Sequence, residues 1–543
     1  MESFEELRVM DQHRLTYQET GQFSKLVLDY LEQATTLKSF YHRPPKVESL
    51  RGQIQEKSSQ FNAPDRNRLV QALMGQYKSA SLLTSEIEYR INTLGNPQTF
   101  TVTTGHQLNL FTGPLYFLYK IIGAIKLTEQ YQKACPDQKF IPVFWMASED
   151  HDFEEISHFN TKGHRIQWDF SSGGPVGRLI TDSLSQVKTD LAQIWKGSKT
   201  GEYLLALFNE AYQPGTSLAQ ATRTLLHALF KNEPLLVVDG DDKELKTCFS
   251  AIIRKELSKG LCAQAIKKTT AALVQKGYHE QVYPRETNLF YCQNVLRERI
   301  IGDPRGFTVD RTDLKFSQVE LLKLVESQPQ NFSPNALMRP LYQERVLPNL
   351  AYIGGAAEVA YWLQLGDCFK ACEVTFPMIY LRNSVALFPE KALRKVESMN
   401  MKLSDLFLKE QDLSRQFVAL NTSLPIDFMP QKTHLKQQFA DLYDLASRTD
   451  PSFLGAVAAQ EKKQLKGLDQ LEQRLIRAEK RKYDESITRL FKQREYLFPE
   501  GLLQERKENM SWGFFELGSD FLDVLKKHID PSDQRFLTLI FKS

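Results

Sequence analysis

Apolar residues recur every three to four positions from residue 1 to about residue 95, which predicts a mainly helical segment. Residues 23–31 show this spacing clearly, because their apolar side chains would share one face of a helix. Pro44 and Pro45 interrupt the pattern, and the turn-forming residues 94–97 end it.

The pattern then changes to short apolar runs that flank one helical stretch. The β-branched run 100–104 predicts a strand, Pro114 opens a helix to about Gln132, and the apolar run 140–147 predicts a second strand. A strand, a helix and a strand in succession form a βαβ unit with parallel strands and a right-handed crossover. A further apolar run at 235–240 resembles another buried strand, so we expect a doubly wound α/β centre.

Residues 390–494 show little strand pattern and keep apolar residues at heptad-like spacing. Such spacing places one apolar stripe along each helix, and the stripe must pack on a partner. We therefore predict two long helices joined through the proline-marked loop at 425–430 as an antiparallel coiled coil. Ordinary long helices of a globular bundle remain an alternative, because the last three positions follow a one-residue slip. The positions are Leu403, Leu406, Leu413, Phe417, Leu420, Leu468, Leu471, Leu475, Ala478, Tyr483, Ile487 and Leu490.

Composition and charge narrow the class of protein. The 543 residues contain 69 Lys and Arg against 66 Asp and Glu, and a nucleic-acid-binding protein would usually show a basic excess. The chain has no apolar run of membrane-spanning length, and its first residues lack the features of a signal peptide. We expect a cytoplasmic protein with reduced thiols and with neither a nucleic-acid nor a membrane partner. Cys368 and Cys372 lack a second Cys or His pair nearby, so we interpret both as packing residues of a helix.

A glycine turn follows the first predicted strand. Thr104, Gly105, His106 and Gln107 lie there, and ligands of open α/β sheets bind outside the carboxyl ends of strands. Gly105 would let a ligand approach the backbone, and His106 could hydrogen-bond a phosphate or an adenine-like group. The helix that follows brings free N–H groups to the same place. A plain glycine turn with a surface histidine is the alternative.

Ionisable residues also follow the second predicted strand. Glu149, Asp150, His151 and Asp152 are costly to place there unless they are solvated, paired or bound to a ligand. They could serve acid–base catalysis, recognition of an ammonium group, or a metal site. No specific metal-ligand spacing occurs, so we predict no metal. We expect Asp150 and His151 to be functional, whereas the acidic residues after them suit the first turn of a helix.

A third polar segment contains Asn335 and Arg339 in an apolar frame. The Arg339 guanidinium could bind a carboxylate or a phosphate through two parallel hydrogen bonds. A buried ion pair is the alternative for this arginine.

A fourth segment places Tyr352, Gly354, Gly355 and Glu358 before a helix-like stretch. The two glycines could admit a ligand at the helix N-terminus, and Glu358 could bind an amine. Alternatively, Glu358 only complements the helix dipole.

Taken together and in order, these segments resemble the bacillithiol biosynthesis cysteine-adding enzyme family, BshC. The run Glu-Asp-His-Asp-Phe after Phe-Trp is the most specific match, and the resemblance covers essentially the whole chain. The matching stretches are 104–107, 112–116, 142–145, 149–153, 331–335, 339–343, 352–355 and 358–362.

The resemblance implies a Rossmann-like parallel-sheet core with connecting insertions and a coiled coil used for homodimerisation. It implies a ligase that joins L-cysteine to glucosaminyl-malate by an amide bond, the last step of bacillithiol synthesis. The family core is similar to that of class I aminoacyl-tRNA synthetases, which suggests ATP and Mg as cofactors. Gly105 and His106 would then stand where those enzymes have a His-Ile-Gly-His motif. Only one histidine is present at this turn, and no Lys-Met-Ser-Lys-Ser equivalent is evident, so ATP dependence stays open.

The same resemblance suggests a division of the chain and of the site. The parts are a catalytic core at 1–388, a coiled-coil domain at 389–500, and a C-terminal segment at 501–543 that packs back on the core. The glycine turn with His106 would hold a phosphate or carboxylate, and Asp150, His151 or Asp152 would act as base or hold the cysteine ammonium. The third and fourth segments would frame the malate-sugar substrate: Asn335, Arg339, Tyr352, Gly354, Gly355 and Glu358. A metal-dependent hydrolase using the cluster at 149–158 and a non-catalytic coiled-coil scaffold remain alternatives.

Overall fold

The computed structural model describes residues 9–170, 173–293, 295–303 and 305–542. It divides into two compact units, which are described separately below. The first contains 22–386 and 504–538 together with an N-terminal stretch, and the second consists mainly of 387–503. Within the described residues, no helix combines the length and apolarity needed to cross a membrane.

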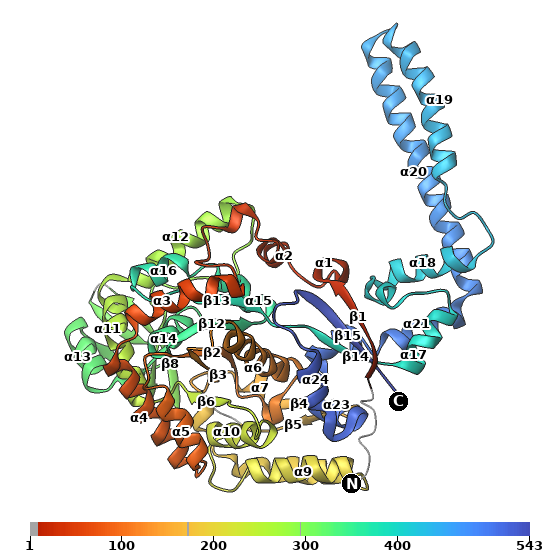
Figure 1. Cartoon of the computed structure of the whole chain (residues 1–543). Coiled ribbons are helices and arrows are strands. Elements are labelled where there is room, and N and C mark those ends of the chain that lie inside the picture. The colour runs from red at the N-terminus through yellow and green to blue at the C-terminus, as the bar shows by residue number, and fades with distance from the viewer. Residues whose placement is uncertain (1–8, 171–172, 294, 304, 543) are drawn as a thin grey trace. The chain divides into compact units, whose positions relative to one another are not determined.

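The centre of the first unit is a five-stranded sheet in which all neighbouring strands run parallel (Figure 1). Its order is β13-β12-β2-β3-β6, so the chain moves outward from β2 to β6 and then returns to the other side of β2. This order confirms the predicted Rossmann-like α/β core and puts the topological switch point between β2 and β12. The strands are β2 (Thr99–His106), β3 (Lys139–Met146), β6 (Leu236–Asp239), β12 (Asn349–Gly354) and β13 (Met378–Leu381).

Helices cover both faces of this sheet because successive strand side chains point in opposite directions. Phe144 of β3 packs on Phe117 of α6 (Tyr116–Ala134). The next residue, Trp145, packs edge-on against Tyr342 of α14 (Arg339–Val346) on the opposite face. The predicted helix after Pro114 is therefore confirmed as the β2–β3 crossover.

Helices dominate the N-terminal part, as predicted, but a strand precedes them. This strand, β1 (Val9–Thr16), belongs to a three-stranded sheet of order β1-β15-β14. Its sequence lacks an apolar alternation, and its neighbour β15 comes from the other end of the chain, so no local pattern could reveal it. The elements are α1 (Tyr17–Thr20), α2 (Lys25–Leu31), α3 (Leu50–Gln60), α4 (Ala63–Ser79), α5 (Ser85–Thr93), β14 (Val385–Pro389) and β15 (Arg535–Phe541).

Two long insertions and a C-terminal segment complete the first unit. The insertion between β3 and β6 contains α7 (Phe153–Ile156), β4 (His158–Thr161), β5 (His164–Gln167), α8 (Ser185–Ile194), α9 (Lys199–Ala211) and α10 (Leu218–Leu229). The insertion between β6 and β12 contains α11 (Lys243–Lys259), α12 (Leu261–Gln275), β7 (Leu289–Gln293), β8 (Leu296–Asp303), β9 (Gly306–Val309), β10 (Lys315–Phe316), α13 (Gln318–Ser327), β11 (Phe332–Pro334) and α14. Helices α15 (Ala356–Trp362) and α16 (Gly366–Ala371) follow β12, and α22 (Gln504–Lys507), α23 (Met510–Leu517) and α24 (Phe521–His528) lie in the C-terminal segment.

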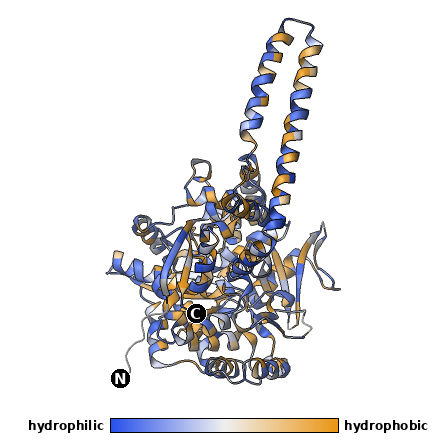
Figure 2. Ribbon diagram, turned by 90° about the vertical axis from the view of Figure 1, so that its right-hand side faces the viewer, coloured by the Kyte–Doolittle hydropathy of each residue, from blue (hydrophilic) through white to orange (hydrophobic). Residues whose placement is uncertain are grey.

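The second unit is helical, as predicted, and contains an antiparallel hairpin of α19 and α20 (Figure 1). Phe439, Ala446 and Val457 form its buried contact, and hydrophobic and hydrophilic residues alternate along both arms (Figure 2). The elements are α17 (Glu390–Ser398), α18 (Glu410–Asn421), α19 (Met429–Ser447), α20 (Pro451–Lys482) and α21 (Asp484–Arg494).

The predicted position of the hairpin turn is wrong. The turn lies at 448–450, whereas Pro430 starts α19, because proline fits the first turn of a helix as well as a loop. Helix α18 does pack on α20, so the predicted pairing of the two apolar stripes exists, but with a short first helix. The one-residue slip in the heptad pattern coincides with Tyr483, where α20 ends and α21 begins.

Candidate active site

A cavity of about 660 Å³ opens at the carboxyl ends of β2, β3 and β12. Gly105, Ala147 and Gly355, which lie at or just beyond these three strand ends, all line it. Parallel α/β sheets bind ligands at such a switch point, because the crossover helices diverge to opposite faces there. The cavity is therefore the candidate active site.

Most of the residues predicted for the site line this cavity. They are Gly105, His106, Gln107, Asp150, His151, Asn335, Arg339, Tyr352, Gly355 and Glu358.

Three predicted residues are not among the lining residues. Thr104 is buried in β2 and donates its hydroxyl hydrogen bond to the Ile353 carbonyl at 2.8 Å. Asp152 caps α7 by accepting a hydrogen bond from the Glu155 N–H at 3.4 Å. Gly354 ends β12, and a Cβ there would lie 3.1 Å from both the Tyr352 ring and Glu358 Cβ.

The glycine turn after β2 is tightly packed. A Cβ on Gly105 would lie 3.1 Å from the Trp145 carbonyl oxygen and 3.3 Å from Trp145 Cβ, so a larger residue would crowd β3. Farther along the loop, Phe111 has a φ of 47°, which an L-residue adopts only when its surroundings hold it there. The Asn509 side chain does so by donating a hydrogen bond to the Phe111 carbonyl at 2.8 Å.

His106 is held as a neutral imidazole. Its Nδ1 lies 3.3 Å from the Gln107 carbonyl oxygen, which can only accept, so Nδ1 carries the hydrogen. Its Nε2 then accepts from the Tyr116 hydroxyl, also at 3.3 Å. Burial, reinforced by the charge of Lys120, lowers the pKa of His106 to about 4.

A buried ion pair joins α6 to the start of α15. Lys120, whose side chain is 1% exposed, donates to Glu358 Oε2 at 2.6 Å and also to the Gly105 carbonyl. Glu358 further accepts from the Tyr352 hydroxyl at 2.6 Å and from the Gly355 N–H at 2.8 Å. Burial alone would raise the pKa of Glu358, but Lys120 and these hydrogen bonds hold it at about 2. The Glu358 carboxylate is thus ionised, and its oxygens already accept hydrogen bonds from neighbouring groups.

Asp150 lies among donors after β3. Gln107 Nε2 donates to Asp150 Oδ2 at 2.8 Å, and the His151 N–H donates to Oδ1 at 2.8 Å. Burial opposes ionisation, but hydrogen bonds from His151 and Gln107 and the charge of Arg297 keep the pKa of Asp150 well below its ordinary value. Asp150 is therefore a carboxylate that can face a cation in the cavity.

His151 is positioned by Arg297. Arg297 Nη1 donates to His151 Nδ1 at 2.7 Å, so the Nδ1 atom presents a lone pair. The same guanidinium lies 3.9 Å from the centre of the Phe290 ring, which holds it in place.

Basic side chains outnumber acidic ones around the cavity. Arg339 lies in the wall with its Nη1 donating to the Gln343 amide oxygen at 2.9 Å. Among the described residues, no carboxylate forms an ion pair with Arg339, Arg285 or Arg299. The basic lining residues are Lys120, Arg285, Arg297, Arg299, Arg339, Arg382 and Arg506, and the acidic ones are Glu149, Asp150 and Glu358. An anionic ligand would complete this set of charges.

Sequence reasoning missed several of these lining residues. The sequence did contain a signal for Lys120, because it is the one charged residue between Tyr116 and Ile125 in an otherwise apolar helix. Arg382 also had one, because a basic residue directly follows β13, and it pairs with Glu505 at 2.7 Å. Arg297 had none, because its strand belongs to a distant insertion.

The acidic cluster at 149–158 does not gather as a three-ligand group. Among the described residues, the group of metal-ligating side chains that meets is instead Cys262, Cys368 and Cys372. Asp150 contacts Gln107 and His151, whereas His158 lies apart in β4.

Comparison with known proteins identifies the family. Residues 10–383 match the family model described as "Bacillithiol biosynthesis BshC, N-terminal Rossmann-like domain", and 385–541 match that of its C-terminal coiled-coil domain. A protein of Flavobacterium johnsoniae named "Putative cysteine ligase BshC" is 45% identical over 96% of this chain and 98% of its own length. A protein of Christiangramia forsetii with the same name is 41% identical over 97% of this chain and 98% of its own.

A solved structure titled as a putative arginyl-tRNA synthetase from Campylobacter jejuni covers 81% of this chain and 94% of its own. Its TM-score is 0.23 at 12% identity, which is too low to support an argument. The family models together span nearly the whole chain, and the two relatives match 96% and 97% of it. The chain belongs to the BshC family of bacillithiol biosynthesis.

Proposed function

We propose that this chain is a cytoplasmic cysteine ligase that joins L-cysteine to glucosaminyl-malate by an amide bond, completing bacillithiol. The observation that carries the proposal is Arg339, whose guanidinium lines the cavity without a carboxylate partner among the described residues. Arg285 and Arg299 are exposed, line the same cavity, and also lack a carboxylate partner among the described residues. Malate carries two carboxylates, and a guanidinium binds each of them best through two parallel hydrogen bonds.

Asp150 is the group that we assign to the cysteine ammonium. Its low pKa makes it a poor proton acceptor at neutral pH but a permanent negative charge in the cavity. Its side chain is 31% exposed, so a small cation can reach it. Asp152, which caps α7, is removed from this role.

We assign the proton acceptor to His151. Amide formation makes the bond between the glucosamine nitrogen and the cysteine carbonyl carbon, breaks a bond from that carbon to oxygen, and releases a proton from nitrogen. His151 lines the cavity next to Asp150, and its Nδ1 atom, which accepts a hydrogen bond from Arg297 in this structure, would take that proton after Arg297 releases the atom. Full product formation by the His151→Ala variant would remove this assignment.

A free carboxylate is a poor electrophile, so the reaction needs an activating group. ATP with Mg would supply this activation, and the surplus of basic lining residues suits its phosphates. The turn at Gly105 would let the phosphates approach the backbone, because a Cβ there would already lie 3.1 Å from the Trp145 carbonyl oxygen. His106, kept neutral, would donate or accept one hydrogen bond there.

The deciding experiment is mass spectrometry of the full chain incubated with cysteine and glucosaminyl-malate, with and without ATP-Mg. We expect bacillithiol only with ATP, together with AMP or ADP. Product without ATP would overturn the nucleotide assignment and point to another activated donor. The Arg339→Ala variant should lose product, whereas Arg51→Ala, at an exposed arginine outside the cavity, should keep it. No product under any condition would favour the scaffold alternative.

We also propose that the hairpin of the second unit forms a homodimer. Exposed apolar residues on α19 and α20 support this: Leu442, Leu445, Phe453, Leu454 and Leu471 are between 40% and 54% exposed. Light scattering should report twice the 62.6 kDa chain mass, and Leu445→Lys with Leu454→Lys should report the monomer. A monomeric wild-type chain would contradict the proposal.

A further inference from the structure

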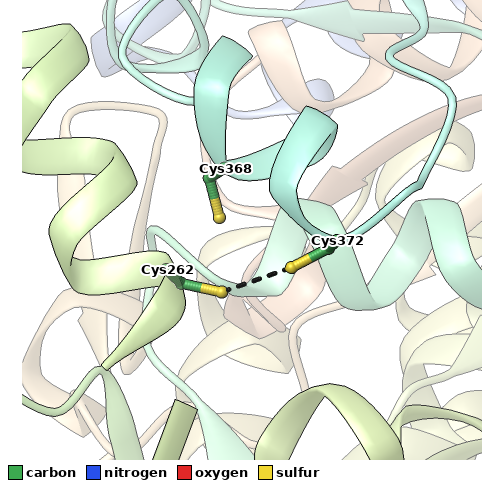
Figure 3. Close-up of side chains that lie close together, drawn as sticks. All are labelled: Cys262, Cys368 and Cys372. Atoms are coloured by element: carbon green, nitrogen blue, oxygen red, sulfur yellow. Dashed lines mark hydrogen bonds between the residues drawn. The ribbon is translucent and has the colours of Figure 1, made fainter. Parts of the chain in front are cut away.

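Three buried cysteines from distant parts of the sequence meet in the first unit. Cys262 lies in the first turn of α12, Cys368 lies in α16, and Cys372 directly follows α16. Their sulfur atoms all lie within 4.8 Å of one another, and the Sγ atoms of Cys262 and Cys372 are 3.6 Å apart. Figure 3 shows the three side chains pointing toward a common centre. All three are free thiols.

The spacing of the sulfurs suits one shared ion. Thiolates bound to Zn²⁺ at about 2.3 Å in tetrahedral directions are about 3.8 Å apart. The 3.6 Å separation of Cys262 and Cys372 is close to this value, and the third sulfur needs only a small adjustment. Cys368 and Cys372 are four residues apart, so a helical turn places both on one face toward α12.

We propose that Cys262, Cys368 and Cys372 form a three-thiolate site for a thiophilic metal ion, Zn²⁺ or Cu⁺. Thiolates select these ions over Mg²⁺ or Ca²⁺, which prefer oxygen. Among the described residues, no His, Asp or Glu joins the group, so Zn²⁺ would take a fourth ligand from solution whereas Cu⁺ accepts three sulfurs. Cys372, at 7% exposed against 0% for the other two, marks the side from which the ion enters.

The site is separate from the proposed ligase chemistry but connects to the cavity wall. The Cys262 N–H donates to Glu256 Oε2 at 2.7 Å, and Asn288 Nδ2 donates to Glu256 Oε1 at 3.1 Å. Asn335 Nδ2 then donates to Asn288 Oδ1 at 2.9 Å, and Asn335 lines the cavity. An ion that fixes Cys262 therefore fixes Asn335 through two hydrogen-bonded intermediates.

A second connection runs from the helix that carries Cys368. Gln364, just before α16, accepts from the Val282 N–H at 3.0 Å and donates to Thr270 Oγ1 of α12 at 2.8 Å. Val282 lines the cavity. The metal would thus clamp α12 to α16, the two helices that hold the cavity segment 282–290.

The test is metal analysis of the full chain, purified under reducing conditions without chelator and then titrated with Zn²⁺ or with Cu⁺. We expect about one ion per chain for the wild type and for Cys248→Ser, a buried cysteine outside the group. Cys262→Ser and Cys368→Ser should each weaken binding at least tenfold. The ion that the chain retains through purification identifies the metal.

Three outcomes would overturn the proposal. They are no uptake of either ion by the reduced wild type, equal uptake by the Cys262→Ser and Cys368→Ser variants, and a Cys262–Cys372 disulfide in place of the metal. Because a variant could simply misfold, sulfur-to-metal absorption of the wild type provides a second measurement, which must appear either with Co²⁺, as a substitute for Zn²⁺, or with Cu⁺ itself. Its absence with both ions would also contradict thiolate ligation.

The connection to the cavity has its own readout. Hydrogen exchange of residues 282–290 should slow at least several-fold when the wild type binds the ion, and should not change in Cys262→Ser. Unchanged exchange in the metal-bound wild type would overturn the clamp. Neither measurement uses ligase activity, so a failure here leaves the proposed reaction untouched, and failure of the reaction leaves this site untouched.

Discussion

Two regions that form the cavity differ in how their charges are satisfied. At the sheet edge, Lys120 and Glu358 pair at 2.6 Å, and neighbouring hydroxyl and N–H groups complete the pair. In the insertion between β6 and β12, Arg285, Arg299 and Arg339 have no carboxylate partner among the described residues. Groups that satisfy each other set the shape of the site, whereas guanidinium groups without a carboxylate partner are free to bind an anionic ligand.

The largest expected effect of a substitution comes from breaking the ion pair between Lys120 and Glu358. Replacing Lys120 by Met leaves Glu358, whose side chain is 25% exposed, without its cation, which should lower the free energy of unfolding by about 2 to 3 kcal/mol. Chemical denaturation measures the change. The double variant Lys120→Met with Glu358→Gln removes both charges and should recover part of the loss. A single variant as stable as the wild type would show that the pair does not set the shape of the site.

Acidification tests the same region through His106. Its pKa is lowered from 6.5 to about 4 in the folded chain, so the unfolded chain binds a proton that the folded chain refuses. The free energy of unfolding should therefore fall by about 3 kcal/mol as the pH falls from about 6.5 to about 4. Above pH 6.5 the contribution of His106 to stability is fully present. His106→Asn should lose this part of the pH dependence. Equal slopes for both proteins would mean that His106 titrates normally.

A smaller effect sharpens the contrast with the inserted region. Arg339→Lys keeps the charge but loses the planar fork, so binding of glucosaminyl-malate should weaken about 10- to 100-fold. Stability should hardly change, because no carboxylate is left unpaired. Calorimetric titration measures the affinity, and Arg51→Lys is the control. An unchanged affinity would remove Arg339 from the substrate site.

The smallest effect concerns Asp152, which lies outside both regions. Asp152→Ala loses the cap of α7 and should cost about 1 kcal/mol or less. Substrate affinity and product formation should stay at the wild-type level. A large loss of product would return Asp152 to the reacting groups and contradict the placement seen here.

Local pattern predicted the elements that surround the switch point. The β-branched run before Gly105, the helix after Pro114 and the apolar run up to Trp145 all appear as β2, α6 and β3. Each of these predictions depends only on residues close in sequence, since side-chain periodicity and proline geometry act within a single helix or strand. The residues that end these strands were therefore predicted as candidates, and most of them line the cavity.

The sequence pattern gave a wrong prediction where the same residue type fits two kinds of element. Pro430 could mark either a loop or a helix start, and only the packing of α19 on α20 places the turn at 448–450. Arg297 and His151 are 146 residues apart, yet they meet at 2.7 Å. No periodicity reports such a pair.

The sequence by itself determined the α/β core, the helical second unit, the family, and most of the residues at the strand ends. Tertiary structure decided which charges pair, which remain free for a ligand, and that Cys262 joins Cys368 and Cys372. The reason is physical. Secondary structure follows from the preferences of nearby residues, whereas desolvation, ion pairing and metal geometry depend on atoms that only the folded chain brings together.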